Sequence, residues 1–437
     1  MTNCTPKLFQ FPTLKKHKII AEFSGGSVTS DGGGLLLREA DKQLNLLEPL
    51  AKFFPDKRDQ SKVQHSTLTM LRQRVFGIAL GYEDLNDHNT LRNDIAIQTI
   101  AGSSDPLASS PTLCRFENLA NQSVAWAIHK QMIEVFIASY QQAPKELILD
   151  FDATDDLIHG EQEGRYFNGY YGNYCFLPLY VFCEKKLLVS YLRTSNKDAA
   201  RHAWAILSLL VKRFRKAWPH VKIIFRGDSG FCRHQMLTWC EKNSVGYIIG
   251  KARNSRLEAM LAPVMLQAEN TFEKTKIKQR LFTEFLYGAK SWSKERRIIG
   301  KAEQTDKGSN PRFIVTNLCD DPQELYDNVY CARGDMENRI KEVQNGLFSD
   351  RTSCHAWWSN QFRMLLSGLA YTLIEYLRSF TLIGTELANA QINTIRLKLF
   401  KIGAVVIKNT RSVRFLLSSH FPLQDLFASI FTKLVPP

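Results

Sequence analysis

The chain has 437 residues, of which 44% are hydrophobic and 23% are charged, a composition typical of globular proteins rather than of disordered or fibrous ones. At roughly 100–200 residues per domain, this length predicts two to four domains. The formal net charge of +14 favours an anionic partner, and nucleic acid is the leading candidate.

Several classes of protein are disfavoured by what the sequence lacks. It contains no apolar stretch of about 18 uncharged residues, so we predict no membrane span and no membrane partner. Residues 1–18 lack the apolar run of a signal peptide, and we therefore expect a cytoplasmic protein. The nine cysteines include no Cys-x-x-Cys pair, which indicates neither a zinc site nor a disulfide framework.

Residues 1–143 form the first predicted region, which is helical. Apolar side chains recur at helical spacing from Leu68 to Ala79, and the stretch from Val124 to Tyr140 continues the pattern. Short helices joined by turns could form a helix-turn-helix that binds DNA ends. A helical bundle that only supports a catalytic domain has the same pattern, so both interpretations stay open.

Residues 144–255 have the alternating strands and helices of an α/β core. The hydrophobic pattern predicts strands at 146–152, 176–182 and 187–192, a helix at 199–216, a strand at 221–225, a helix at 233–241 and a strand at 246–249. Three strands therefore precede the first helix of this core, and the family resemblance described below implies that they belong to a mixed sheet flanked by helices.

Two carboxylates stand at the ends of these strands. Side chains alternate along a strand, so Asp150 and Asp152 face the same way, and we prefer Asp152 because it opens an Asp-x-Thr turn. Asp228 ends the fourth strand between Gly227 and Gly230, which would allow a close approach. Since sites in open sheets lie at the carboxyl ends of strands, we expect Asp152 and Asp228 to share one cleft. An aspartate at a strand end can also be an ordinary turn residue or helix cap.

The rest of the chain divides into three predicted regions. Residues 256–322 form a β-rich insertion with strands at 282–287, 296–299 and 312–316, residues 323–380 complete the core, and residues 381–437 form a basic helical tail. Within the second of these regions, Tyr330, Arg333, Glu337 and Lys341 have the spacing of one helix face. Such a face is also typical of a solvated stripe of ion pairs.

Three converging carboxylates, Asp152, Asp228 and Glu337, would repel one another unless cations neutralised them. Hard oxygen ligands without Cys or His partners suit Mg²⁺, for which Mn²⁺ can substitute. Two such ions about 3.5–4 Å apart can support an in-line phosphoryl displacement. That chemistry cuts or joins DNA strands.

Tyr330-x-x-Arg333-x-x-x-Glu337 resembles the Tyr-Arg-Glu-Lys motif of DDE transposases from bacterial insertion sequences, which have an RNase H-like fold. The motif lysine would fall at Gln344, and Lys341 lies one turn earlier. Further stretches resemble the insertion-sequence 1380 group. They are residues 71–76, 81–87, 111–118, 159–162 and 226–231.

The resemblance implies an RNase H-like core, an inserted mostly β subdomain and a helical N-terminal region. It also implies that Asp152, Asp228 and Glu337 form a metal-binding catalytic triad. Tyr330, Arg333 and Lys341 would then contact DNA phosphates near the cut.

The resemblance further implies an endonuclease that frees 3′-hydroxyl ends at the terminal inverted repeats and joins them to target DNA. The enzyme would pair two ends as a homodimer, on DNA in the bacterial nucleoid. Two alternatives stay open, an RNase H-like nuclease without joining activity and a DNA-binding remnant without catalysis.

Overall fold

The computed structural model describes residues 7–436, which form two compact units. The first unit contains the described residues up to Ala127, Gly346–Phe348, and those from Leu369 onward, and the second contains Ile128–Asn345 and Ser349–Gly368. Residues 1–6 of the predicted N-terminal region and residue 437 of the predicted tail lie outside the described residues. The five-region division is finer than these units and stays a prediction.

Short helices make up most of the first unit. Ser66 caps α2 and Asp94 caps α4 by accepting hydrogen bonds from backbone N–H groups, and Arg74 forms a buried ion pair with Glu117 (2.7 Å). The helices are α1 (Leu35–Leu44), α2 (Thr67–Leu80), α3 (His88–Leu91), α4 (Ile95–Ala101), α5 (Ser110–Glu117), α13 (Ile392–Ile395), η10 (Arg396–Phe400) and α14 (Gln424–Leu434). Short 3₁₀ turns join them at η1 (Gly32–Gly34), η2 (Glu48–Phe53), η3 (Gln60–Lys62) and η4 (Leu85–Asp87).

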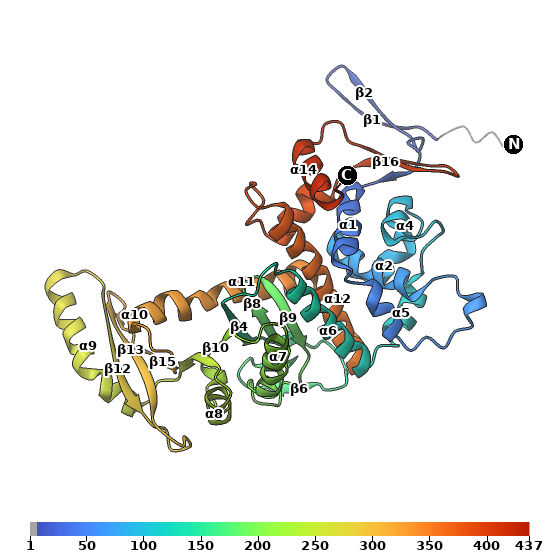
Figure 1. Cartoon of the computed structure of the whole chain (residues 1–437). Helices are drawn as coiled ribbons and strands as arrows, with labels where there is room; N and C mark the ends of the chain where they lie inside the picture. The colour runs from blue at the N-terminus through green and yellow to red at the C-terminus, as the bar shows by residue number, and fades with distance from the viewer. Residues whose placement is uncertain (1–6, 437) are drawn as a thin grey trace. The chain divides into compact units, whose positions relative to one another are not determined.

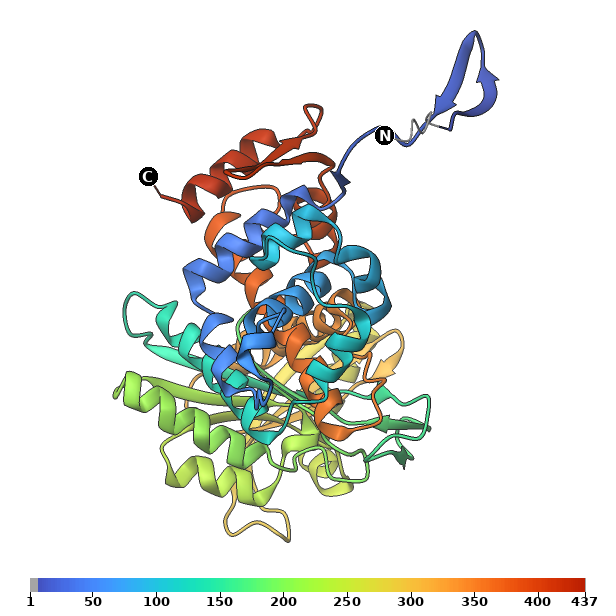
Figure 2. The same ribbon diagram turned by 90° about the vertical axis from the view of Figure 1, so that its right-hand side faces the viewer.

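The first unit also contains strands that the sequence pattern did not predict. They are β1 (Phe9–Leu14), β2 (His17–Ala21), β3 (Val28–Thr29), β16 (Ala404–Lys408) and β17 (Val413–Leu417). The β1–β2 hairpin extends away from the helices of its unit (Figures 1 and 2), and β16 lies between β17 and β3 in a second sheet. The prediction of a helical tail is therefore wrong at residues 404–417, where Val405, Val406 and Ile407 form a β-branched run that favours a strand.

A large mixed sheet forms the centre of the second unit. Its order is β12-β13-β15-β11-β10-β4-β8-β9, with β14 paired to β13. The strands are β4 (Glu146–Ala153), β8 (Leu179–Cys183), β9 (Lys186–Tyr191), β10 (Lys222–Gly227), β11 (Gly246–Lys251), β12 (Gln279–Tyr287), β13 (Arg296–Thr305), β14 (Gly308–Ser309) and β15 (Arg312–Thr316). β10 is parallel to both β4 and β11, whereas β8, β9 and β15 are antiparallel to their neighbours.

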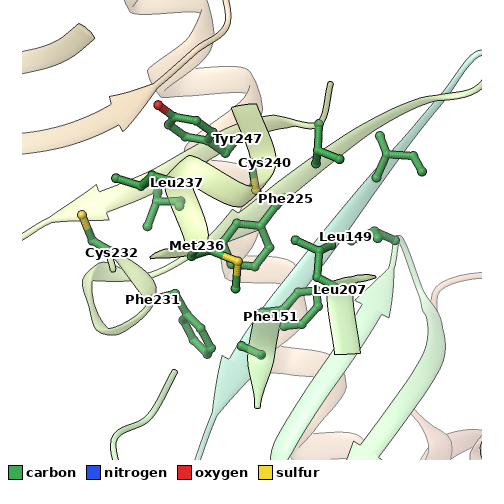
Figure 3. Packing of buried hydrophobic residues seen from close by; sticks show 14 of the residues in the cluster. Leu149, Phe151, Leu207, Phe225, Phe231, Cys232, Met236, Leu237, Cys240 and Tyr247 are labelled. Carbon is green, nitrogen blue, oxygen red and sulfur yellow. The ribbon is translucent and has the colours of Figure 1, made fainter. Parts of the chain in front are cut away.

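The predicted strands and helices of the core are present in the predicted order. Three short strands that were not predicted, β5 (Asp156–Leu157), β6 (Tyr166–Asn168) and β7 (Asn173–Phe176), lie between β4 and β8 and form a separate sheet. Helix α7 (Ala203–Ala217) connects β9 to β10, and α8 (His234–Lys242) connects β10 to β11 after the short turn η5 (Ser229–Phe231). Figure 3 shows Phe151 and Phe225 of the sheet beside Leu207 of α7 and Met236 of α8. This apolar cluster holds β4 and β10 together beneath the two helices.

The opposite face of the sheet is covered by the segment that precedes Glu337. Ile224 of β10 and Ile248 of β11 pack there against Leu325 and Tyr326. Because side chains alternate along a strand, the even-numbered residues at the end of β4 point to this same face. The acids of β4 therefore share a face with the segment that carries Tyr330, Arg333 and Glu337.

The insertion differs in part from its prediction. Its three predicted strands are confirmed as β12, β13 and β15, but it begins with the long helix α9 (Ser255–Thr275), which packs on β12 and β13 (Figure 1). Its strands do not form a sheet of their own, because β15 pairs with β11 and thereby extends the main sheet. The edge that β11 would otherwise expose is covered in this way.

The remaining helices include the segment with the predicted motif. They are α6 (Gln122–Ala138), α10 (Pro322–Glu324), η6 (Leu325–Tyr330), η7 (Cys331–Arg333), α11 (Gly334–Lys341), η8 (Glu342–Gly346), α12 (Trp357–Tyr376) and η9 (Leu377–Thr381). The prediction of one regular helix face from Tyr330 to Lys341 is wrong, because η6 is a π-helical turn and η7 a 3₁₀ turn. In the described part of the chain, no helix combines the length and apolar character needed to cross a bilayer.

Candidate active site

Asp152 and Asp228 stand at the carboxyl ends of two adjacent parallel strands. The register pairs Phe151 of β4 with Gly227 of β10, and Asp152 and Asp228 are the residues that follow this pair. Asp152 accepts a hydrogen bond from its neighbour Ala153 (2.9 Å). Both acids are partly exposed at the same edge of the sheet.

Asp228 has a structural contact as well. Its Oδ1 accepts a hydrogen bond from the backbone N–H of Gly230 (2.8 Å), which caps the short turn η5. A Cβ on Gly230 would lie 3.0 Å from that oxygen, so a larger residue would press against the cap. Asp228 thus serves as a cap, the ordinary role of an aspartate at a strand end, while its second carboxylate oxygen has no role in that cap.

Asp150, the neighbouring acid on the same face of β4, is engaged in a buried ion pair. It lies opposite Arg226 on β10, whose guanidinium binds both carboxylate oxygens, with a distance of 2.7 Å from Nη2 to Oδ2. Arg226 also donates to the backbone carbonyl of Val329 in η6. This pair joins the two parallel strands to the segment that carries the third acid.

Arg333 links Asp152 to Glu337. Its Nη1 lies 3.3 Å from Oδ2 of Asp152, and its Nη2 lies 3.2 Å from Oε1 of Glu337. The side chain of Glu337 is 50% exposed, whereas those of Arg333 and Asp152 are largely covered. The predicted ion pair between Arg333 and Glu337 is thus present, and it extends to the end of β4.

Tyr330 reaches the site from the end of η6. A Cβ on Gly250 of β11 would lie 2.6 Å from the Tyr330 hydroxyl oxygen and 2.9 Å from the backbone nitrogen of Ser229. Only glycine therefore fits at position 250 while Tyr330 keeps this position. The same Cβ would lie 3.3 Å from the carbonyl carbon of Asp228, so the Tyr330 hydroxyl and Asp228 approach Gly250 together. Burial raises the pKa of Tyr330, the charge of Arg333 opposes this increase, and the charge of Asp228 adds to it.

Lys341 is not gathered with the other predicted residues. It is exposed at the end of α11 and, within residues 7–436, takes part in no hydrogen bond or ion pair. Gln344, at the position of the motif lysine, donates a hydrogen bond to the carbonyl of Asp155 just after β4 (3.2 Å). Glu342, the carboxylate that follows Glu337 in the chain, is buried and pairs with Arg339 (2.8 Å).

The three acids influence one another electrostatically. Burial raises the pKa of Asp152 from its ordinary 3.8 to about 6. The positive charge of Arg333 opposes this increase, while the charges of Asp228 and Glu337 add to it. The site therefore holds more negative charge than one guanidinium compensates.

A divalent cation fits the chemistry of this site. Its donors are carboxylate oxygens, the ligands that Mg²⁺ and Mn²⁺ prefer, and a cation would offset the repulsion at Asp152. Among the described residues, however, no three acidic, histidine or cysteine side chains are gathered closely enough to bind a metal as they stand. Between Asp152 and Glu337 the positive charge is supplied by Arg333.

Several contacts of the site were not predicted from the sequence, among them the ion pair of Arg333 with Asp152. The pairing of Asp150 with Arg226 could have been found by aligning the two parallel strands from their charged ends. The hydrogen bond of Gln344 and the approach of Tyr330 to Gly250 had no signal, because both depend on how distant segments pack.

Comparisons with known proteins support one family. The profile of the family described as Transposase DDE domain group 1 matches residues 11–436. Among solved structures, the cryo-EM structure of the piggyBac transposase synaptic complex with hairpin DNA is similar at a TM-score of 0.45 and 9% identity, over 85% of this chain and 80% of that chain. No curated protein sequence matches the chain.

Proposed function

The chain belongs to the DDE transposase family, Transposase DDE domain group 1, and on this premise we propose that it mobilises a bacterial insertion sequence of the 1380 group. It would cleave DNA at the terminal inverted repeats and join the freed 3′-hydroxyl ends to target DNA in the cytoplasm. The observation that carries this proposal is the pair of parallel strands β4 and β10, which end at Asp152 and Asp228 beside the Arg333–Glu337 pair.

The sheet topology supports an RNase H-like assignment for the core. Three antiparallel strands, β4, β8 and β9, are followed by β10 and β11, which run parallel to β4, in the order β9-β8-β4-β10-β11. In this assignment Asp152 lies at the end of the first core strand and Asp228 directly follows the fourth. Glu337 follows the insertion on α11.

Asp152, Asp228 and Glu337 would hold two Mg²⁺ ions, for which Mn²⁺ can substitute. When bound, such ions activate a nucleophile and stabilise the leaving oxygen of a phosphodiester. Arg333 has to release at least one of its two carboxylates before Asp152 and Glu337 can act together. Its guanidinium can then bind a DNA phosphate, which accepts the same forked pair of hydrogen bonds as a carboxylate.

Tyr330 and Lys341 have separate roles in this proposal. Tyr330 is held beside Asp228 by its fit against Gly250, so its hydroxyl can donate to a phosphate oxygen near the cut. Lys341 is exposed at the last residue of α11, and its ammonium group would bind a phosphate of the DNA backbone as a point charge. The residues 1–143 would bind the element ends, and two copies of the chain would pair those ends as a homodimer.

The proposal is tested by Asp228→Asn, which keeps the side-chain size and the cap but removes the charge. We expect cleavage of a DNA fragment carrying the element end to be lost while binding to that fragment is retained. Asp306→Asn, in an exposed turn between β13 and β14, is the matched control and should cleave normally. Cleavage by the Asp228→Asn variant at the normal rate would contradict the assignment.

A further inference from the structure

Exposed aromatic side chains gather on a small hairpin that follows Asp152 in the chain. The hairpin is formed by β6 (Tyr166–Asn168) and β7 (Asn173–Phe176), and β7 also pairs with β5 (Asp156–Leu157). Tyr170 is 89% exposed, and Phe167, Tyr174 and Tyr166 are each exposed by two fifths or more. We call residues 166–176 the aromatic hairpin. Such a group of exposed rings is typical of a binding surface.

Hydrogen bonds hold the tip of the aromatic hairpin in place. The Asn168 side chain accepts hydrogen bonds from the backbone N–H groups of Tyr170 (2.9 Å) and Tyr171 (3.3 Å). It also donates to the carbonyl of Ser195 (2.9 Å), and the Ser195 hydroxyl donates to the carbonyl of Tyr166 (3.0 Å). The backbone is thus fixed while the Tyr170 ring remains exposed, so binding to this ring does not require the backbone of the hairpin to become ordered.

The aromatic hairpin is paired with the chain segment that follows Asp152, because Asp156 of β5 lies opposite Phe176 of β7. Strand β5 begins shortly after Asp152, and Gln344 binds the carbonyl of Asp155 between them (3.2 Å). Burial raises the pKa of Tyr171 to about 12, and the charges of Asp155, Tyr170 and Asp152 add to this increase. The Tyr171 ring stands edge-on to the Tyr170 ring, with centroids 4.9 Å apart.

The rings are accompanied by a cation. The Arg165 guanidinium lies over the Tyr174 ring, 4.0 Å from its centroid, and Phe167 stands edge-on to the same ring at 5.5 Å. Aromatic faces combined with an arginine are the chemistry that binds single-stranded nucleic acid. The flat face of a base inside a duplex is hidden by its neighbours, so only an unpaired base could use such rings.

We propose that Tyr170 of the aromatic hairpin stacks on an unpaired nucleobase of the DNA strand held at Asp152 and Asp228. The inference rests on the proposed function for placing DNA at the acids. It assigns a separate binding role to a part of the chain that holds none of those acids.

The test measures binding of the full chain to a single-stranded oligothymidylate of about 20 nucleotides and to a blunt duplex of the same length, in EDTA. We expect Tyr170→Ala to weaken oligothymidylate binding about 5- to 150-fold, the range for the loss of one stacked base, with duplex affinity unchanged within about twofold. Tyr170→Phe should bind as tightly as the unmodified chain. Phe431→Ala, which removes a half-exposed ring from α14, is the control and should change neither affinity.

Three results would overturn the inference. Tyr170→Ala could leave oligothymidylate affinity unchanged, it could weaken duplex binding equally, or Tyr170→Phe could lose as much affinity as the alanine variant. A change in self-association of Tyr170→Ala by sedimentation, with unchanged DNA affinity, would identify a protein contact instead. Because no cleavage is measured, a failure of the catalytic assignment at Asp228 leaves this result interpretable by itself.

Discussion

At the scale of single residues, the two acids on the same face of β4 differ in their partners. Asp150 forms a buried ion pair with Arg226 through both carboxylate oxygens, which gives it a structural role. Asp152 is bound more loosely, by Arg333. Alternation along the strand predicted their common face, but it could not show which acid would be neutralised. The catalytic role of Asp152 stays a prediction, and the properties of both acids can be measured.

The buried pair should dominate the stability of the site. Arg226→Met leaves Asp150 buried without its partner, and we expect the free energy of unfolding to fall by about 3–5 kcal/mol, measured by urea denaturation. Adding Asp150→Leu replaces the pair by apolar side chains and should recover part of this loss. Recovery is incomplete because the Val329 carbonyl has still lost its donor. A double variant less stable than the single one would contradict the ion-pair account.

Asp152 should make stability depend on pH. Its folded pKa is about 6 and its ordinary value is 3.8, so between these values the unfolded chain loses its proton first. The contribution of protonated Asp152 to the free energy of unfolding is therefore complete below pH 3.8 and is lost as the pH rises through about 6. In EDTA, Asp152→Asn should be more stable than the unmodified chain at pH 8, by up to about 3 kcal/mol. At pH 4 the two proteins should unfold at nearly equal urea concentrations, whereas an equal difference at both pH values would contradict this explanation.

At the scale of elements, the site depends on a segment that departs from regular helix. The hydrophobic pattern was sufficient to predict β4 and β10, because each is an apolar run that ends at an acid. It could not predict the π-helical and 3₁₀ turns before α11. Those turns accompany the packing of Leu325 and Tyr326 on Ile224 and Ile248 of the sheet, a contact between segments far apart in the chain.

The fit between β11 and η6 should be sensitive to one methyl group. Gly250→Ala would place a Cβ 2.6 Å from the Tyr330 hydroxyl oxygen, so Tyr330 has to move away from Asp228. We expect the variant to lose about 1–3 kcal/mol of stability and most of its cleavage activity. Adding Tyr330→Phe removes the clashing oxygen and should recover part of the stability. If Gly250→Ala unfolds at the same urea concentration as the unmodified chain, the close approach is not rigid.

At the scale of the whole molecule, sequence reasoning predicted the main elements of the core but not the strand pairings outside it. The strands of the main sheet and the helices over 144–255 were predicted in their order because they follow from local periodicity, whereas the small sheet β5-β7-β6 was not predicted. The pairings of β15 with β11 and of β3 with β16 join segments that are distant in the chain. The β1–β2 and β16–β17 hairpins are local, and sequence reasoning missed them because it read both ends of the chain as helical. Net charge and family membership both point to DNA, but neither distinguishes a transposase that joins strands from a nuclease that only cuts.

Asp152, Asp228 and Glu337 are proposed to form one site that joins DNA strands, a claim that strand transfer with pre-cut element ends can decide. With Mn²⁺ and a supercoiled target plasmid, the unmodified chain should insert the 3′-hydroxyl ends into the plasmid. Asp152→Asn, Asp228→Asn and Glu337→Gln should each abolish insertion while still binding the ends, and Asp306→Asn should insert normally. Cleavage of uncut ends without any insertion of pre-cut ones, or normal insertion by any of the three acid variants, would contradict the claim.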